Sequence, residues 1–318
     1  MLAEKWFAHR GAGGSAKPRT VMDVCIEYLG HLCNAGRGDA AADARGRFKR
    51  WVYPDVKPAH TALVKLTPKA VDDWRRRVAH AAPLRVSRRA SESAPTRRSA
   101  SALNRDMTSL RAALNLAFEN GYATTDHARR TKLRPVKDAD GRRTIYLDAG
   151  QRRALIAHAS TDPADFLRAL AQFPLRPGAM AAPRIRDFDA RLATLMIGND
   201  KAGGDRFIGL PRTMAEFLAE RCQGRQPEVP LLPRANGEAW NKDAWKKPLK
   251  QAARDAGLPE GTVAYALRHS AITDLIALHR LDTMTVAQLA GTSLLMIEKN
   301  YGHLLREHAR SALAGLVL

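Results

Sequence analysis

Four residues in the C-terminal half of the chain could together perform chemistry on a phosphate group. They are Arg176 in the segment PLRPG, Lys201 in KAGGDR, Arg268 in YALRH and Tyr301 in EKNYGHL. Taken singly, each is more often a surface charge or a packed side chain than a functional group. Taken together, they supply two fixed cations, a proton donor and a nucleophile, which are the parts that phosphoryl chemistry needs.

The chemistry of a phosphodiester explains why these residue types belong together. When a phenol attacks the phosphorus, the non-bridging oxygens gain negative charge, and the sequence offers no cluster of metal ligands to neutralise it. Arg176 and Arg268 would hold those oxygens, because a planar guanidinium can donate two hydrogen bonds at once. Lys201 would protonate the departing 5′ oxygen. Tyr301 would become linked to the 3′ phosphate, and we expect neither a metal nor another cofactor.

The segment around Arg268 has the spacing of a helix with one polar face. Tyr265, Arg268 and His269 stand at i, i+3 and i+4 and therefore share that face. His269 and His303 are candidates for moving a proton, although a histidine within a helix more often has a structural role. The sequence alone leaves the general base open.

In order and local context, PLRPG, KAGGDR, YALRH and AGTSLLMIEKNYGHL resemble the catalytic domain of tyrosine recombinases, the phage-integrase family. The resemblance implies a site-specific DNA recombinase that cleaves and rejoins duplex DNA through a 3′-phosphotyrosine, without metal or ATP. It implies double-stranded recombination sites as partners and a homo-tetramer on synapsed DNA, with a monomer or dimer when free. It also implies an α+β catalytic domain, mainly α with a small β-hairpin, after an all-helical core-binding domain.

Three positions depart from the family pattern. Tyr265 stands where the family usually has the first histidine of H-x-L-R-H, and Thr292 stands at the histidine or tryptophan place before the nucleophile. Ala179 replaces an acidic residue often found after the first arginine. A phenol and a hydroxyl can both donate a hydrogen bond to phosphate, but both are poor proton acceptors at pH 7. With these substitutions, the resemblance assigns Tyr265 and Thr292 to the catalytic set.

The composition agrees with a nucleic-acid partner. The chain has 318 residues, with 52 Lys and Arg against 32 Asp and Glu, which gives a formal charge of +20 spread along the sequence. Such a field attracts a polyanion, most commonly nucleic acid, with an acidic membrane surface as the competitor. No apolar run is long enough to span a bilayer, and the N-terminal segment lacks the apolar core of a signal peptide. We expect a cytoplasmic protein that associates with the nucleoid when it binds DNA.

Helix caps and apolar periodicity divide the chain into four parts. We expect an N-terminal extension over 1–17, a helical DNA-binding domain over 18–128, a basic linker over 129–143 and a catalytic domain over 144–318. The alternating stretch that surrounds Gly203-Gly204 predicts the β-hairpin, with Lys201 at its tip.

Basic and polar residues outside the catalytic set are candidates for phosphate contacts, which position a protein on DNA more than they read sequence. They are Arg97, Arg98, Asn104, Arg105, Arg142 and Arg143. For those at the helix start, a solvated surface is an equal alternative. After Tyr301 an apolar stripe continues, and it would dock on a neighbouring protomer or pack on its own domain. That stripe comprises Leu304, Leu305, Ala309, Ala312, Leu313 and Leu316.

Two other functions remain open at this stage. The segment VAQLAGTSLLMIEKNY also fits a helix-turn-helix, so the protein could be a DNA-binding regulator or a recombinase of the same fold that binds without cutting. A regulator, however, has no use for Lys201 or Arg176. A topoisomerase would use the same nicking and resealing chemistry without choosing a sequence.

Overall fold

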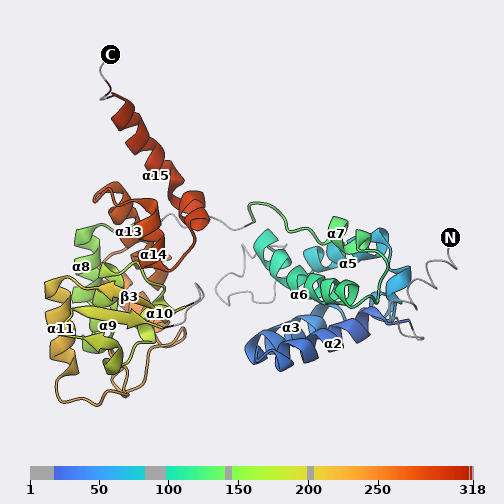
Figure 1. Cartoon of the computed structure of the whole chain (residues 1–318), viewed down its shortest axis with the longest axis horizontal. Coiled ribbons are helices and arrows are strands. Elements are labelled where there is room, and N and C mark those ends of the chain that lie inside the picture. The colour runs from blue at the N-terminus through green and yellow to red at the C-terminus, as the bar shows by residue number, and fades with distance from the viewer. Residues whose placement is uncertain (1–17, 83–97, 140–144, 199–203, 315, 317–318) are drawn as a thin grey trace. The chain divides into compact units, whose positions relative to one another are not determined.

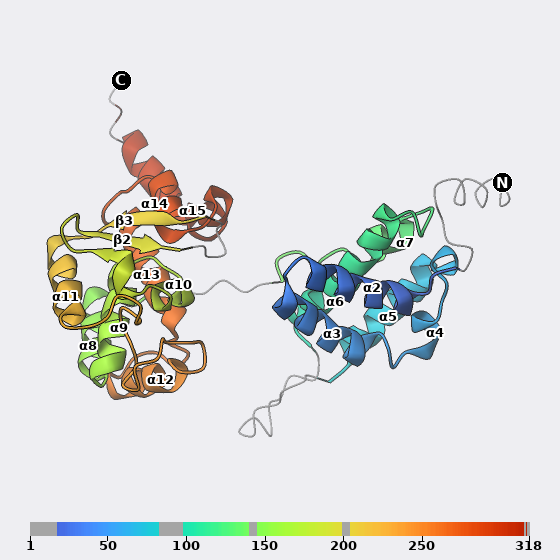
Figure 2. The ribbon, with the colours of Figure 1, turned by 60° about the horizontal axis from the view of Figure 1, so that its bottom comes forward.

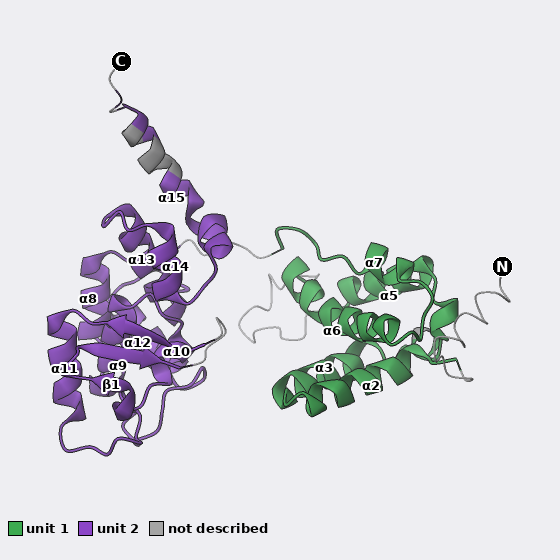
Figure 3. Cartoon of the chain, in the orientation of Figure 1, with its two compact units in different colours: residues 1–141 green, residues 142–318 purple. Residues whose placement is uncertain are grey.

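The computed structural model describes residues 18–82, 98–139, 145–198, 204–314 and 316 (Figure 1). The chain forms two compact units, which comprise residues 1–141 and 142–318 (Figure 3). They are called unit 1 and unit 2 below, and each is described by itself.

Helices are the main elements of the described part of unit 1, with one isolated bridge between Thr20 and Ala62. Its elements are α2 (Val21–Asn34), α3 (Gly38–Trp51), α4 (Val56–Ala59), the 3-10 turn η1 (Leu63–Lys65), α5 (Pro68–His80), α6 (Ala100–Glu119) and α7 (His127–Lys132). The start of α5 follows capping chemistry: the Thr67 hydroxyl accepts a hydrogen bond from the Ala70 amide at 3.2 Å, and Pro68 opens the helix. Phe48, Trp74 and Met107 are among the side chains that form a core between the helices.

The end of unit 1 differs from the predicted boundary at residue 128. Helix α7 packs on α5, Leu133 is fully buried, and Val136 packs against the same core. The amide side chain of Asn104 in α6 binds both backbone groups of Val136, at 2.8 and 2.9 Å. Residues 129–136 of the predicted linker therefore belong to unit 1. Isolated apolar residues in a basic segment produce no periodicity, which is why the sequence pattern did not indicate this packing.

Unit 2 combines helices with one small antiparallel sheet, and the predicted fold class is confirmed. The helices before the sheet are α8 (Ala149–Ala157), α9 (Thr161–Gln172), α10 (Pro177–Ala181) and the 3-10 turn η2 (Ile185–Asp187). The strands are β1 (Phe188–Asp189), β2 (Thr194–Ile197) and β3 (Arg206–Gly209). The helices after it are α11 (Arg212–Cys222), α12 (Lys246–Asp255), α13 (Ala264–Ala277), α14 (Thr283–Ala290) and α15 (Leu294–Ala314).

The sheet has the strand order β1-β2-β3, with both pairs antiparallel. The predicted hairpin is the β2–β3 pair, in which Leu195 faces Ile208 and Ile197 faces Arg206. Strand β1 was not predicted, since two residues are too short to show alternation. The hairpin tip, with Lys201, lies outside the described residues.

Helix α13 occupies the middle of unit 2 and contacts α9, α10, α14 and α15 (Figure 2). Its side chains are buried around most of its circumference, as expected for a helix surrounded by others. Ser270 accepts a hydrogen bond from the Leu147 amide at 2.8 Å, while Asp274 accepts one from the Tyr146 hydroxyl at 2.8 Å and pairs with Arg152. These polar contacts fix α13, and with it Arg268.

Among the residues that the structure describes, no helix has both the length and the apolar character needed to cross a bilayer.

Candidate active site

The turn between α14 and α15 is where the predicted catalytic arginines meet. Arg268 Nη1 donates hydrogen bonds to the carbonyl oxygens of Pro174 at 2.6 Å and Ala290 at 2.7 Å. Arg176 Nη1 donates to the carbonyl oxygen of Gly291 at 2.5 Å. Two arginines that are far apart in sequence therefore bind adjacent carbonyls of one turn, which we call the catalytic turn (Ala290–Thr292).

Arg268 lies in a strongly positive and poorly hydrated environment. Its exposed fraction is only 8%. The pKa of Arg268 is lowered to about 10, mainly by burial and secondly by the charge of Arg176. The charge of Arg206 lowers this pKa as well. The phenols of Tyr301 and Tyr265 raise the pKa of Arg268, so both lie within electrostatic reach of its guanidinium. Arg268 still carries its charge at pH 7, and an anion bound here would relieve the repulsion between the guanidiniums.

Tyr301 lies in α15, in an apolar cluster formed with α13 and α14, and is 8% exposed. Its hydroxyl is 3.1 Å from Nδ1 of His269, and the two rings stack with their centroids 5.2 Å apart. When Nδ1 carries no proton, the hydroxyl is the donor in this bond. His269 can therefore both orient the phenol and accept its proton. His303, the other histidine that the sequence suggested, is exposed.

Two of the three positions that depart from the family pattern, Tyr265 and Thr292, also lie at the site. Tyr265 is the second residue of α13 and is 40% exposed, and its phenol interacts electrostatically with the guanidinium of Arg268. Thr292 is half-buried in the catalytic turn, where its amide donates to the carbonyl of Ala287 at 3.0 Å and closes α14. Both can present a hydroxyl to an anion held by the arginines.

The residues predicted to contact DNA in unit 1 have different surroundings. The Arg98 guanidinium is buried, pairs with Asp106 and lies 4.4 Å from the ring centroid of Trp51. Asn104 holds Val136, as described above, whereas Arg105 is exposed. Arg98 and Asn104 thus have structural partners inside unit 1, and the DNA contacts of all three stay a prediction. Four further candidates, Lys201, Arg97, Arg142 and Arg143, lie outside the described residues.

Sequence reasoning missed Arg206, the first residue of β3. It stands on the same face of the strand as Ile208, which is 3% exposed, because side chains two apart point the same way. A Cβ built on Gly291 would lie only 2.5 Å from both terminal nitrogens of Arg206, so this guanidinium packs against the catalytic turn. The sequence signal that could have identified Arg206 was a charged residue at an inward-facing position of the predicted strand.

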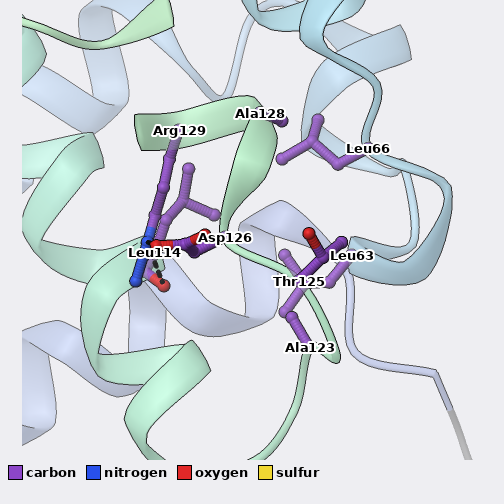
Figure 4. A pocket seen from close by; sticks show the side chains of 8 residues that line it. All are labelled: Leu63, Leu66, Leu114, Ala123, Thr125, Asp126, Ala128 and Arg129. Atoms are coloured by element: carbon purple, nitrogen blue, oxygen red, sulfur yellow. Dashed lines mark hydrogen bonds and ion pairs between the residues drawn. The ribbon is translucent and has the colours of Figure 1, made fainter. Parts of the chain in front are cut away.

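A small pocket in unit 1 lacks comparable chemistry (Figure 4). Leu63 and Leu66 supply apolar walls. Its charged groups bind within the pocket: Arg129 pairs with Asp126 at 3.1 Å and donates to the carbonyl of Leu114 at 3.3 Å. These contacts attach α7 to α6. The pocket is therefore a gap in the packing between the helices and not a second active site.

Comparison with known proteins identifies the fold of this chain. No protein-family model and no curated protein matches it. A solved Tn1549 transposon integrase in complex with a circular intermediate DNA matches with a TM-score of 0.66 at 15% identity, over 93% of this chain and 99% of that one. A lambda integrase dimer bound to a COC′ core site matches with a TM-score of 0.61 at 15% identity, over 86% and 75% of the two chains.

A lambda integrase tetramer bound to a Holliday junction gives the same TM-score of 0.61 at 15% identity, over 86% of this chain and 78% of that one. The chain therefore has the fold of tyrosine recombinases, and the resemblance read from its motifs is confirmed at the level of the fold. At such low identity the likeness establishes the fold, while the reaction has to be inferred from the side chains.

Proposed function

We propose that the protein is a site-specific DNA recombinase of integrase type, which cleaves and rejoins duplex DNA through a 3′-phosphotyrosine at Tyr301. One observation carries the proposal: the Tyr301 hydroxyl is hydrogen-bonded to His269 and lies within electrostatic reach of Arg268, beside Arg176. The hydrogen bond pairs the proposed nucleophile with a proton acceptor, and the charge interaction with Arg268 supports a phosphate site in the same region. The formal charge of +20 and the fold shared with DNA-bound integrases support the same substrate.

Phosphate binding would be the task of Arg176 and Arg268. A guanidinium carries several N–H groups, so one that is anchored on a carbonyl through Nη1 can also donate to a phosphate oxygen. The catalytic turn would hold both guanidiniums in place before DNA arrives, which lowers the reorganisation needed in the transition state. The hydroxyls of Tyr265 and Thr292 would add hydrogen bonds to the same phosphate.

Strand cleavage then follows from the contact between Tyr301 and His269. The phenolic oxygen forms a bond to phosphorus while its proton passes to Nδ1 of His269. The bond from phosphorus to the 5′ oxygen breaks, and that oxygen takes a proton from Lys201, whose role rests on its sequence position. In the reverse reaction a 5′ hydroxyl attacks the phosphotyrosine and the protons return, so that the strand is rejoined without ATP.

The proposed partners are double-stranded recombination sites and further copies of the chain. The active assembly would be a homo-tetramer on synapsed DNA, by analogy with the lambda integrase tetramer bound to a Holliday junction. In the absence of DNA the protein would be a monomer or dimer. The protein would act in the cytoplasm, on DNA of the nucleoid.

The test is covalent trapping on a nicked suicide duplex whose sequence comes from the borders of the protein's own gene. Tyr301→Phe should keep the DNA affinity and lose the adduct, because only the hydroxyl is removed. Tyr28→Phe, which keeps its ring against Phe48 in unit 1, is the matched control and should form the adduct normally.

Each alternative gives a different outcome in this assay. An adduct that survives Tyr301→Phe would show that another residue is the nucleophile. A wild-type protein that binds the duplex tightly but never forms an adduct would be a DNA-binding protein of the same fold. Relaxation of any supercoiled plasmid without pairing of sites would indicate a topoisomerase.

A further inference from the structure

We infer that Arg206 is a positioning residue that holds the catalytic turn through its contact with Gly291. The inference rests on the proposed function, which supplies the reaction by which it is tested. Arg206 is on strand β3, whereas Gly291 ends helix α14, so the contact joins the hairpin to the segment that leads into Tyr301.

Gly291 is required at its position for two independent reasons. Its φ of +59° lies in the left-handed region, where a residue without Cβ is favoured. In addition, a Cβ there would lie 2.5 Å from Nη1, 2.5 Å from Nη2 and 2.6 Å from Cζ of Arg206. The three distances are nearly equal, so the guanidinium group as a whole, and not one terminal nitrogen, covers the space beside Gly291.

The catalytic turn links this contact to the reacting groups. The carbonyl of Gly291 accepts the bond from Arg176, and the carbonyl of Ala290 accepts a bond from Arg268. Arg206 therefore packs against the turn whose two carbonyl oxygens, those of Ala290 and Gly291, bind the phosphate-binding arginines. Its charge also reaches Arg268. A shift of the turn would move Arg176, Arg268 and the start of α15 together.

The hairpin is the other element that the contact involves. Arg206 faces Ile197 across the β2–β3 pair, at the end of the ladder from which the tip extends. Arg206 therefore ties strand β3 to the turn whose carbonyl oxygens bind Arg176 and Arg268. We expect its loss to slow the chemical step more than DNA binding.

The experiment measures the single-turnover rate of adduct formation on the suicide duplex at saturating DNA, together with the Kd for DNA and the Tm of each variant. Arg206→Ala should lower the rate by about 10²-fold, the size of effect produced by a misplaced catalytic group, while Kd changes little. Arg206→Lys keeps the charge but not the planar group, so it should stay far slower than the wild type.

Glycine variants test the contact from its other side. Gly291→Ala should slow cleavage as Arg206→Ala does, and the double variant should be no slower than Gly291→Ala alone, because both changes break one contact. Gly257→Ala is the matched control: Gly257 also has a positive φ, +63°, but a Cβ there would meet nothing within 4 Å. It should cleave at the wild-type rate even if its Tm falls.

Three results would overturn the inference while leaving the proposed function intact. They are a wild-type rate in Arg206→Ala, a wild-type rate in Arg206→Lys, or rate losses that multiply in the double variant. A fall in Tm with an unchanged rate would likewise assign Arg206 to folding alone. The absence of any adduct from the wild-type protein would instead overturn the proposed function, and with it this inference.

Discussion

At the residue scale, the two phosphate-binding arginines differ in what they contribute besides charge. Arg268 is 8% exposed and bridges two carbonyls from separate segments, Pro174 and Ala290. Arg176 is half-buried and donates to the carbonyl oxygen of Gly291. Removing Arg268 would leave two carbonyl oxygens without this donor inside the protein. The loss of Arg268 should therefore lower both the stability and the cleavage rate.

We therefore predict that Arg176→Ala and Arg268→Ala each lower the cleavage rate by about 10²-fold or more. Arg268→Ala should also lower the free energy of unfolding, by about 1–3 kcal/mol, measured by urea denaturation. Arg212→Ala is the control, since the Arg212 side chain is 91% exposed and pairs only on the surface with Glu216. Near-wild-type cleavage in both site variants would refute the phosphate site.

Tyr265→His restores the residue that the family usually has at this position. Tyr265 is 40% exposed, so the smaller ring should leave no buried cavity. An imidazole can donate a hydrogen bond to phosphate and can also accept a proton near pH 7, which a phenol does poorly. Adduct formation should be equal to or faster than that of the wild type in the suicide-duplex assay. Complete loss of activity would give Tyr265 a specific role that the family pattern lacks.

How much of the site the sequence could predict depended on how local the signal was. Arg268 and His269 were recognisable because they sit in one helix with Tyr265, at spacings that place them together. The contact of Arg206 with Gly291 joins residues far apart in sequence, and a single strand position carries no sign of its partner. The hydrogen bond between His269 and Tyr301 could not be predicted from local sequence either, because it depends on how α13 and α15 pack.

At the scale of elements, capping chemistry made several helix starts predictable. Thr67-Pro68 opens α5, and Asp148 caps α8: its carboxylate accepts from the Gln151 amide, and its own amide donates to the Gln151 side chain. The start of α6 shows the limit of such rules. Arg98, just before it, has the sequence context of a surface charge, yet the fold buries it between Trp51 and Asp106.

We predict that Arg98 and Arg105 play separable roles in unit 1. Arg98→Ala leaves the carboxylate of Asp106 buried without its partner, so it should lower the free energy of unfolding by about 3 kcal/mol or more. Arg105→Ala should leave stability unchanged, because this side chain is exposed. It should weaken DNA binding and reduce the slope of log K against log salt by about 1.

Each variant is the control for the other, measured by denaturation and by DNA binding across a salt series. Weakened DNA binding in Arg98→Ala with unchanged stability would return Arg98 to the DNA surface. A salt slope unchanged in Arg105→Ala would instead remove Arg105 from the phosphate contacts.

At the scale of the whole molecule, the last helix extends from the active site to an exposed apolar end. Leu304 and Leu305 pack against the cluster that contains Tyr301, so the stripe begins as part of unit 2. Leu313 and Leu316, by contrast, are 66% and 72% exposed. Leu304 and Leu305 thus pack on their own domain, while docking of the exposed end on a neighbouring protomer stays a prediction.

We predict that the double variant Leu313→Glu and Leu316→Glu prevents assembly of several protomers on synapsed DNA, because charge on an apolar docking surface opposes its burial. Folding should be unaffected, since both positions are exposed in the single chain. Analytical ultracentrifugation of the protein with its DNA measures the assembly, and recombination between two sites measures the consequence. Leu278→Glu is the control, because Leu278 is 68% exposed at the end of α13. Assembly of the double variant to the wild-type size would place the contact between protomers on another surface, and α15 would then serve unit 2 alone.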